Sequence, residues 1–245
     1  MNIALILSGG TGRRLGMDMP KQYIEVAGRP VISYSIRQLS IHSSVDVIQI
    51  VADPAWRPAI GEWLELEDVE HKFRGFSDPG ENRQLSILHA LEDIRTYAGN
   101  EDYVFVHDAA RPLLSARQIG ECLGGVAGHD ALVPVLPMKD NVYSSTDGKR
   151  ITSLLNRSEI FAGQAPEVFQ LGKYYDANMR LMPERILDIN GSAEPAILAG
   201  MEVYLIPGDE GNFKITTPGD LERFQKMMSE NGMDSSAGTD RNKEK

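Results

Sequence analysis

The sequence predicts an α/β fold built on a mostly parallel sheet, with a protruding β-arm. Short apolar runs rich in β-branched residues alternate with amphipathic stretches, which is the pattern of βαβ units. The run from Ile3 to Leu7 is continuous rather than alternating, as expected for a strand buried on both faces. Between about residues 139 and 164 short alternating segments replace this pattern, which indicates a β-excursion from the sheet.

The predicted elements follow one another along the chain. The strands are short apolar runs over residues 3–7, 45–51, 72–76, 103–107, 131–135, 203–206 and 213–216. The helices have apolar residues at helical spacing, over residues 31–39, 54–66, 81–97, 115–127 and 217–229. Pro30 and Ser115 support two of the helix starts, because proline is tolerated in a first turn and a serine hydroxyl caps free N–H groups.

A single domain is expected over residues 1–228 of the 245-residue chain, which is long enough to bury a full core. The turn Thr146-Asp147-Gly148 predicts a hairpin inside the β-arm, since Asp-Gly favours tight turns. The arm is a candidate contact with a partner subunit. From Asn231 the chain lacks apolar periodicity, so residues 231–245 are expected to form a disordered tail.

Charge and composition exclude several functions. With 25 Lys and Arg against 35 Asp and Glu, the formal net charge is −10, which argues against binding nucleic acids or anionic membranes. The single cysteine, Cys122, excludes a disulfide framework and a multi-cysteine metal site. No apolar run approaches the roughly 18 residues of a membrane span, and no signal peptide is recognised. A cytoplasmic protein is therefore expected.

A glycine-rich turn, Ser8 to Gly16, directly follows the first strand. Glycines let backbone N–H groups approach phosphate oxygens, although such turns also serve strand-to-helix geometry alone. The turn is not a Walker loop, because no Lys-Ser/Thr follows, and Leu15 stands where a dinucleotide fingerprint needs its third glycine. The cations Arg13, Arg14 and Lys21 nevertheless suit a triphosphate.

Four ordered segments carry a resemblance to a known family: residues 7–23, 79–86, 106–112 and 212–221. They resemble the signature of cytidylyltransferases that act on sugar-alcohol phosphates. Over about residues 1–228 the chain is similar to the 2-C-methyl-D-erythritol 4-phosphate cytidylyltransferase family, which is related to ribitol-5-phosphate cytidylyltransferase. The resemblance implies a Rossmann-like nucleotidyltransferase three-layer sandwich, a homodimer through the β-arm and a place in isoprenoid biosynthesis. It also implies transfer of CMP from CTP to a polyol phosphate, with Mg²⁺ or a similar divalent cation and release of pyrophosphate.

The same resemblance assigns site residues position by position. The CTP-binding residues would be Ser8, Gly9, Gly10, Thr11, Gly12, Gly80, Arg83 and Ser86. Arg14 and Lys21 would stabilise the pentacovalent transition state and the leaving pyrophosphate. Lys214 and Arg157 would position the acceptor phosphate, with Arg157 acting across the dimer interface.

Asp108 and Arg111 would lie in the acceptor and ribose region. Arg111 matches an arginine that reaches toward the partner subunit's substrate. Magnesium would be held mainly by the CTP phosphates, with Asp108 as a candidate indirect contact. The neighbouring His107 is interpreted as a packed strand residue rather than a catalyst.

The acceptor half departs from the family pattern. Asn141 follows Asp140 where the family has Asp-Thr, Ala165 and Glu167 stand in place of Thr-Pro-Gln, and Asn190–Glu194 replaces an acidic, hydroxyl-bearing motif. Changed partners for hydroxyl groups change which polyol fits. Ribitol 5-phosphate or another alditol phosphate therefore stays open as the acceptor. A nucleotidyltransferase of different base or sugar specificity and a non-catalytic nucleotide-binding subunit are further alternatives, and the presence of Arg14 and Lys21 disfavours the non-catalytic one.

Overall fold

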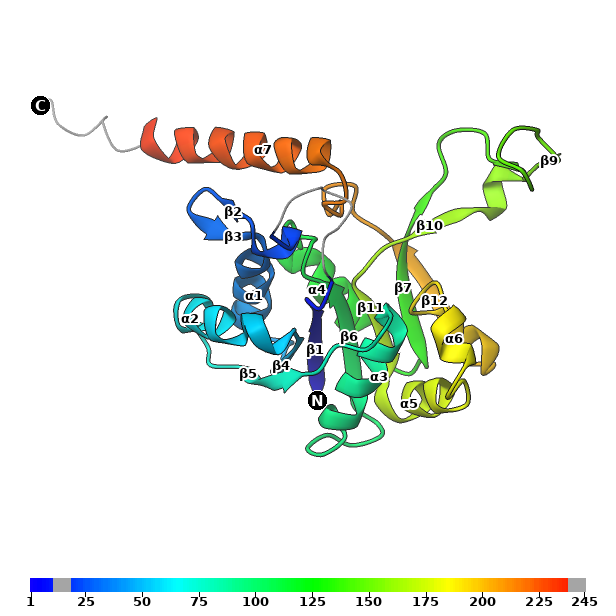
Figure 1. Cartoon of the computed structure of the whole chain (residues 1–245), viewed down its shortest axis with the longest axis horizontal. Helices are drawn as coiled ribbons and strands as arrows, with labels where there is room; N and C mark the ends of the chain where they lie inside the picture. Colours follow the sequence, from blue (N-terminus) through cyan, green and yellow to red (C-terminus); the bar gives the residue numbers. More distant parts are fainter. Residues whose placement is uncertain (11–18, 238–245) are drawn as a thin grey trace, which may run out of the picture.

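The computed structural model describes residues 1–10 and 19–237, and its core is an eight-stranded mixed sheet in the order β10-β7-β11-β6-β1-β4-β5, with β12 also paired to β7 (Figure 1). These strands are β1 (Asn2–Leu7), β4 (Val47–Val51), β5 (Phe73–Ser77), β6 (Tyr103–Asp108), β7 (Ala131–Pro137), β10 (Phe161–Gly163), β11 (Glu167–Gln170) and β12 (Val203–Pro207). Strands β6, β1, β4 and β5 are parallel, whereas β11 is antiparallel to both β6 and β7. The predicted α/β fold with parallel core strands is confirmed.

Helices cover both faces of this sheet and give three layers. One core cluster joins α1 (Val31–Ile41), α2 (Arg57–Glu67) and α4 (Ala116–Gly125) to the sheet residues Ala4 and Ile6. A second cluster, on the opposite face, joins the sheet residues Ile3 and Leu5 to α3 (Arg83–Ile94), α5 (Leu171–Met179) and α6 (Glu194–Leu198). Successive side chains of a strand point to opposite faces, so β1 is apolar throughout because both faces are covered.

The C-terminal helix α7 (Pro218–Ala237) lies next to a small hairpin of β2 (Glu25–Val26) and β3 (Arg29–Pro30) (Figure 1). Phe224 of α7 and Val26 belong to one buried cluster. The helix runs beyond the predicted end near residue 229, and the remaining part of the predicted tail, residues 238–245, lies outside the described residues.

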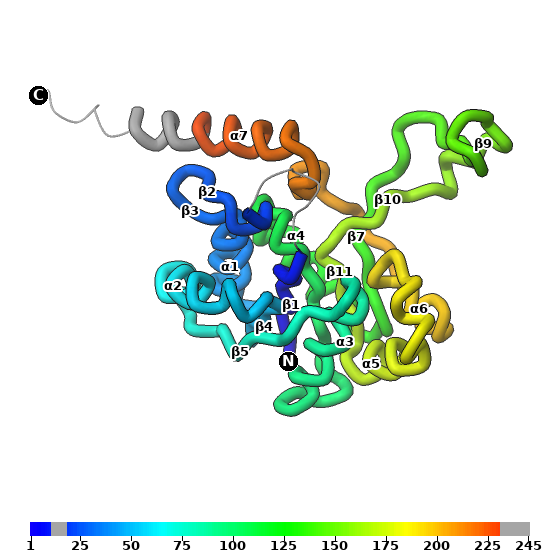
Figure 2. The backbone as a smooth tube through the Cα atoms, viewed as in Figure 1, coloured from blue at the N-terminus to red at the C-terminus, as the bar shows by residue number. Residues whose placement is uncertain are grey.

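The β-arm leaves the sheet after β7 and returns through β10 (Figure 2). Its hairpin pairs β8 (Tyr143–Ser144) with β9 (Ser153–Leu154), around the predicted Asp-Gly turn. Asp147 Oδ1 accepts hydrogen bonds from the backbone N–H groups of Lys149 and Arg150 at 2.8 and 2.9 Å. Gly148 has a φ of +67°, which other residues rarely adopt, and this explains the glycine at that position.

The structure differs from the prediction in two segments near the site. The predicted strand at residues 213–216 is a loop. The backbone N–H and hydroxyl groups of Thr216 and Thr217 donate hydrogen bonds to the Asp220 carboxylate, so these N–H groups do not pair with a neighbouring strand. The strand β11 and the helix α5 were not predicted. β11 has only four residues and is inserted antiparallel between two strands that are distant in sequence, so local periodicity gives little signal. Among the described residues no helix is long and apolar enough to cross a membrane.

Candidate active site

A cavity of about 450 Å³ opens at the carboxyl ends of β1, β4 and β6. The last residues of these strands, Leu7, Val51 and Asp108, line it. Open α/β sheets bind ligands at this edge. The predicted site residues that line the cavity are Gly9, Gly10, Lys21, Gly80, Arg83, Ser86, Asp108 and Lys214. Chain segments far apart in sequence therefore meet in one place.

The start of the glycine-rich turn is held by side chains from the short 3₁₀ helix Lys21–Tyr23. Gln22 Nε2 donates to the carbonyl oxygens of Ser8 and Gly10 at 2.7 and 2.8 Å, and the Ser8 hydroxyl donates to the Tyr23 hydroxyl at 2.8 Å. Ser8 thus shapes the turn from a buried position. A Cβ on Gly9 would lie 2.7 Å from Pro79 Cβ, so the close approach of these two loops requires glycine. The predicted Thr11, Gly12 and Arg14 lie outside the described residues.

The N-terminus of α3 forms another wall of the cavity. Asn82 caps the helix by accepting a hydrogen bond from the Leu85 N–H at 2.8 Å. Gly80 N–H donates to Ser86 Oγ at 2.9 Å, and a Cβ on Gly80 would approach the Leu85 side chain to 2.6 Å. A helix N-terminus beside a cavity favours a negatively charged ligand.

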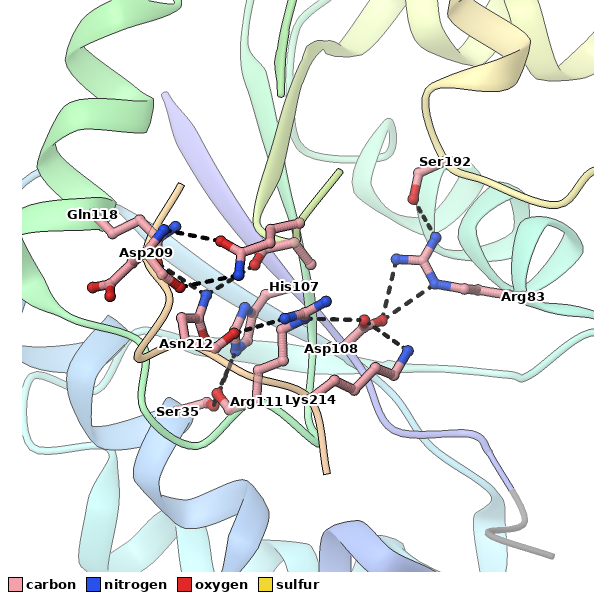
Figure 3. A network of polar contacts seen from close by, with 12 residues as sticks. Ser35, Arg83, His107, Asp108, Arg111, Gln118, Ser192, Asp209, Asn212 and Lys214 are labelled. Carbon is pink, nitrogen blue, oxygen red and sulfur yellow. Dashed lines mark hydrogen bonds and ion pairs between the residues drawn. The ribbon is translucent and has the colours of Figure 1, made fainter. Parts of the chain in front are cut away.

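Asp108 lies at the centre of a cluster of cations (Figure 3). Its Oδ1 accepts hydrogen bonds from Arg83 Nε and Nη2 at 3.2 and 3.1 Å, and its Oδ2 accepts one from Lys214 Nζ at 2.9 Å. Arg111 Nε lies 3.7 Å from Oδ2. Burial by itself would raise the pKa of Asp108, but the three neighbouring cations hold that pKa well below its usual range. Because one ionised carboxylate neutralises only one of the three cations, this cluster keeps a net positive charge that would attract an anionic substrate.

The segment that carries Lys214 is tied to the rest of the site through Asn212. Arg111 Nη1 donates to the Asn212 carbonyl at 2.6 Å, and Asn212 Nδ2 donates to Gln118 Oε1 and to the Ala165 carbonyl, each at 2.9 Å. Figure 3 shows Arg111 between Asn212 and Asp108. In the described chain Arg111 thus contacts groups of its own subunit, and burial lowers its pKa against the opposing effect of Asp108.

Sequence analysis did not assign Ser192 and Glu167 to the site, and it noted their segments only as departures from the family pattern. Arg83 Nη1 donates to Ser192 Oγ, and Glu167 lies close enough for the Arg83 charge to act on it. Burial raises the pKa of Glu167, and the charge of Arg83 opposes this rise. Glu167 is the first residue of β11, which pairs with the strand that ends at Asp108. Its position near Asp108 could have been predicted only if β11 itself had been predicted.

His107 and Arg157 occupy contrasting places. His107 is fully buried, its Nε2 lies 3.1 Å from Ser35 Oγ, and burial lowers its pKa to about 4. The interpretation of His107 as a packed residue is thus confirmed. Arg157 is exposed on the β-arm and donates to the Lys139 carbonyl at 2.7 Å, so this chain does not bring it to its own cavity.

Comparisons with known proteins identify the family of this chain. A family model described as 2-C-methyl-D-erythritol 4-phosphate cytidylyltransferase matches residues 2–230. The chain is 34% identical over 239 residues to the 2-C-methyl-D-erythritol 4-phosphate cytidylyltransferase of Rubrobacter xylanophilus, covering 93% of this chain and 94% of that protein. It is 31% identical over 228 residues to the ribitol-5-phosphate cytidylyltransferase of Lactiplantibacillus plantarum, covering 90% and 95%.

Solved structures show the same fold. The 4-diphosphocytidyl-2C-methyl-D-erythritol synthase of Anaerococcus prevotii superimposes with a TM-score of 0.79 at 22% identity, covering 93% of this chain and 96% of that one. The 2-C-methyl-D-erythritol 4-phosphate cytidylyltransferase of Francisella tularensis gives a TM-score of 0.76 at 24% identity, covering 91% and 99%. The chain belongs to the 2-C-methyl-D-erythritol 4-phosphate cytidylyltransferase family, and it is a CTP-dependent cytidylyltransferase of polyol phosphates.

Proposed function

We propose that the acceptor is 2-C-methyl-D-erythritol 4-phosphate, which places the enzyme in isoprenoid biosynthesis. The family model over residues 2–230 and the 34% identical relative support this acceptor. The observation that carries the reaction is the cluster of Arg83, Arg111 and Lys214 around Asp108, in a cavity that Lys21 also lines. A site that receives a triphosphate and a second phosphate needs such an excess of cations.

In the proposed reaction a phosphate oxygen of the acceptor attacks the α-phosphorus of CTP. A new P–O bond forms, the bond between the α-phosphorus and the bridging oxygen breaks, and pyrophosphate leaves with that oxygen and its charge. Catalysis then depends on in-line positioning and on cations placed where negative charge develops. Lys21 and Arg14 stabilise the transition state and the leaving group, and Lys214 orients the attacking phosphate.

The proposed CTP site consists of the turn at Ser8 to Gly12 together with Gly80, Arg83 and Ser86. Backbone N–H groups of the turn and the N-terminus of α3 would bind phosphates and the base. Asp108 holds the Arg83 and Lys214 side chains beside the cavity, with the ribose and the acceptor next to it. A base whose hydrogen-bonding edge differs from that of cytosine would leave the fixed donors and acceptors of the site unpaired, so the site would reject it.

Nucleotidyltransferases of this kind typically use a divalent cation, and the lining of the cavity is compatible with Mg²⁺. The lining includes two carboxylates, Glu81 and Asp108. No group of three His, Cys, Asp or Glu side chains within residues 1–10 and 19–237 could hold a metal ion by itself. Mg²⁺ commonly binds through one or two carboxylates together with substrate phosphates. We propose that the CTP phosphates hold the ion, near Asp108, where it would neutralise phosphate charge.

We further propose that the β-arm joins two subunits into a homodimer and that Arg157 acts in the partner's site. The arm exposes apolar side chains that a monomer would leave in water, namely Tyr143, Ile151, Leu154, Leu155 and Phe161. Mixing Lys214→Ala with Arg157→Ala tests this pairing. If each site needs Lys214 and the partner's Arg157, the mixture recovers up to about a quarter of the wild-type activity, because half the dimers then contain one intact site. A mixture as inactive as its components would contradict it.

Ribitol 5-phosphate is the second candidate acceptor, favoured by the departures at Asn141, Ala165 and residues 190–194 and by the Lactiplantibacillus plantarum relative. Pyrophosphate release with CTP should be measured against the 4-phosphates of methylerythritol and erythritol, ribitol 5-phosphate and glycerol 3-phosphate. The highest kcat/KM is expected with methylerythritol 4-phosphate. A higher value with ribitol 5-phosphate would replace the proposed acceptor. No release with any acceptor, despite CTP binding, would favour a non-catalytic subunit.

A further inference from the structure

Lys214, the cation proposed to orient the acceptor phosphate, lies in a loop. The segment between β12 and α7, residues 208–217, belongs to no helix or strand. A lysine side chain is itself a flexible stem that ends in a point charge. The position of the Lys214 charge in the cavity therefore depends on the contacts that hold this loop.

Asn212, two residues before Lys214, joins this loop to three other parts of the chain. Its side chain is fully buried, and its Nδ2 donates to Gln118 Oε1 of α4 and to the Ala165 carbonyl just before β11, each at 2.9 Å. Its backbone carbonyl accepts a hydrogen bond from Arg111 Nη1 at 2.6 Å. Because a buried amide is unfavourable unless its donors are paired, these partners fix the orientation of Asn212.

Ile215 anchors the loop on the other side of Lys214. Its N–H donates to the Ala110 carbonyl at 2.9 Å, and its side chain is buried in one cluster with Phe224 of α7. Lys214 is thus flanked by anchored residues, and its Nζ donates to Asp108 Oδ2 at 2.9 Å beside the cavity (Figure 3). The contacts of the loop, rather than a helix or strand, place this ammonium group.

We propose that Asn212 is a positioning residue that holds this loop so that Lys214 meets the acceptor phosphate. The proposal rests on the proposed function, in which Lys214 orients that phosphate. Lys214 lines the cavity, whereas Asn212 does not, so Asn212 acts on the reaction through the loop. A displacement of about 1 Å in a positioning group can lower a rate about a hundredfold. Loss of Asn212 should therefore impair use of the acceptor and leave CTP binding, proposed at the glycine turn and α3, nearly unchanged.

The test is a double-mutant cycle on kcat/KM for the acceptor at saturating CTP, with the polyol phosphate that gives the highest wild-type value. Lys214→Ala is expected to lower kcat/KM about a hundredfold, and Asn212→Ala about tenfold. The double variant should be no lower than Lys214→Ala alone, because the loop then has no ammonium group to place. The dissociation constant of CTP, measured by calorimetry, should stay within about threefold of wild type in Asn212→Ala.

Ser40→Ala is the control for a loss of stability alone. The Ser40 hydroxyl is buried in α1, donates to Asp68 Oδ1 at 2.7 Å and accepts from the Glu70 N–H at 3.0 Å. None of these residues lines the cavity. This variant should unfold at a lower urea concentration than wild type and keep the wild-type kcat/KM for the acceptor.

A wild-type kcat/KM in Asn212→Ala beside an impaired Lys214→Ala would overturn this proposal alone. A double variant about a thousandfold below wild type would also overturn it, because the two effects would then be independent. An equal loss of CTP affinity in Asn212→Ala would indicate a general structural role and overturn it too. If Asn212→Ala fails to fold, Gln118→Leu, which removes one acceptor of the Asn212 amide, replaces it in the cycle under the same criteria.

Failure of the proposed function gives different results. Full activity of Lys214→Ala would overturn the role proposed for Lys214 and this inference with it. A wild-type preference for ribitol 5-phosphate would overturn only the proposed acceptor, and the cycle would then be measured with ribitol 5-phosphate.

Discussion

The cavity and the β-arm differ in how they hold the side chains proposed to act in the reaction. In the cavity, Asp108 is buried and in contact with Arg83 and Lys214, each from a different segment of the chain. On the arm, Arg157 is exposed and bound to the neighbouring Lys139 carbonyl. The cavity residues are oriented by this subunit alone. The role proposed for Arg157 therefore depends on the proposed homodimer, in which Arg157 would act in the site of the second subunit.

The largest expected effect concerns the cavity. Lys214→Ala should lower kcat/KM for the acceptor about a hundredfold or more, because in the proposed reaction the Lys214 charge positions the attacking phosphate, an effect worth about 3 kcal/mol. Steady-state pyrophosphate release is the measurement. Lys226→Ala, on the exposed surface of α7, is the matched control and should behave as wild type. A Lys214→Ala variant with full activity would contradict the proposed role of the cavity in the reaction.

The next effect tests how closely the cavity is packed. Gly80→Ala should weaken CTP binding by about 1–3 kcal/mol, because its Cβ would be 2.7 Å from Leu85 Cβ and would displace the α3 N-terminus. Calorimetry with CTP checks it. Gly61→Ala is the control, since a Cβ there meets nothing within 4 Å and alanine favours the helix. Equal CTP affinity in both variants would show that the loop relaxes without cost.

A smaller effect concerns the base of the arm, where the two regions meet. Gln164 donates to the Asp209 carbonyl and accepts from the Asp209 N–H, both at 3.0 Å. Gln164→Ala should lower the free energy of unfolding by about 1–2 kcal/mol and raise KM for the acceptor, because Asp209 precedes the Lys214 segment. Urea unfolding and kinetics measure these quantities. Gln225→Ala, at an exposed position of α7, is the control. A wild-type KM in Gln164→Ala would show that the base of the arm does not affect acceptor binding in the cavity.

The smallest effect is a pH dependence of stability. Because the folded-state pKa of Glu167 is raised, the folded protein binds the extra proton, and stability from this group is complete below its unfolded pKa of about 4.3. That stability is lost as pH rises through the folded-state pKa. Glu167→Gln should therefore become more stable relative to wild type as the pH rises from 4 to 8, which urea unfolding at a series of pH values measures. Parallel stability profiles would contradict a buried, proton-binding Glu167.

Much of the cavity was predictable because its residues follow elements with strong local patterns. Asp108 ends a buried strand and the glycine turn follows another, so the parallel sheet brings both to one edge. The segment at Lys214 was recognised as part of the site, although its predicted strand was wrong. Its loop conformation depends on contacts with Asp220 and Ala110 rather than on apolar alternation.

The sequence by itself determined the layered α/β fold, the hairpin in the arm and which residues gather at the carboxyl edge. The fold and the hairpin follow from periodicity and turn chemistry, which are local, whereas Gly80, Arg83 and Lys214 were assigned through the resemblance to a known family. Only the tertiary structure decided that Glu167 lies beside Asp108 and that Ser192 reaches Arg83 across 109 positions of the chain. Both depend on the antiparallel insertion of β11 and on long-range contacts, which no local pattern encodes.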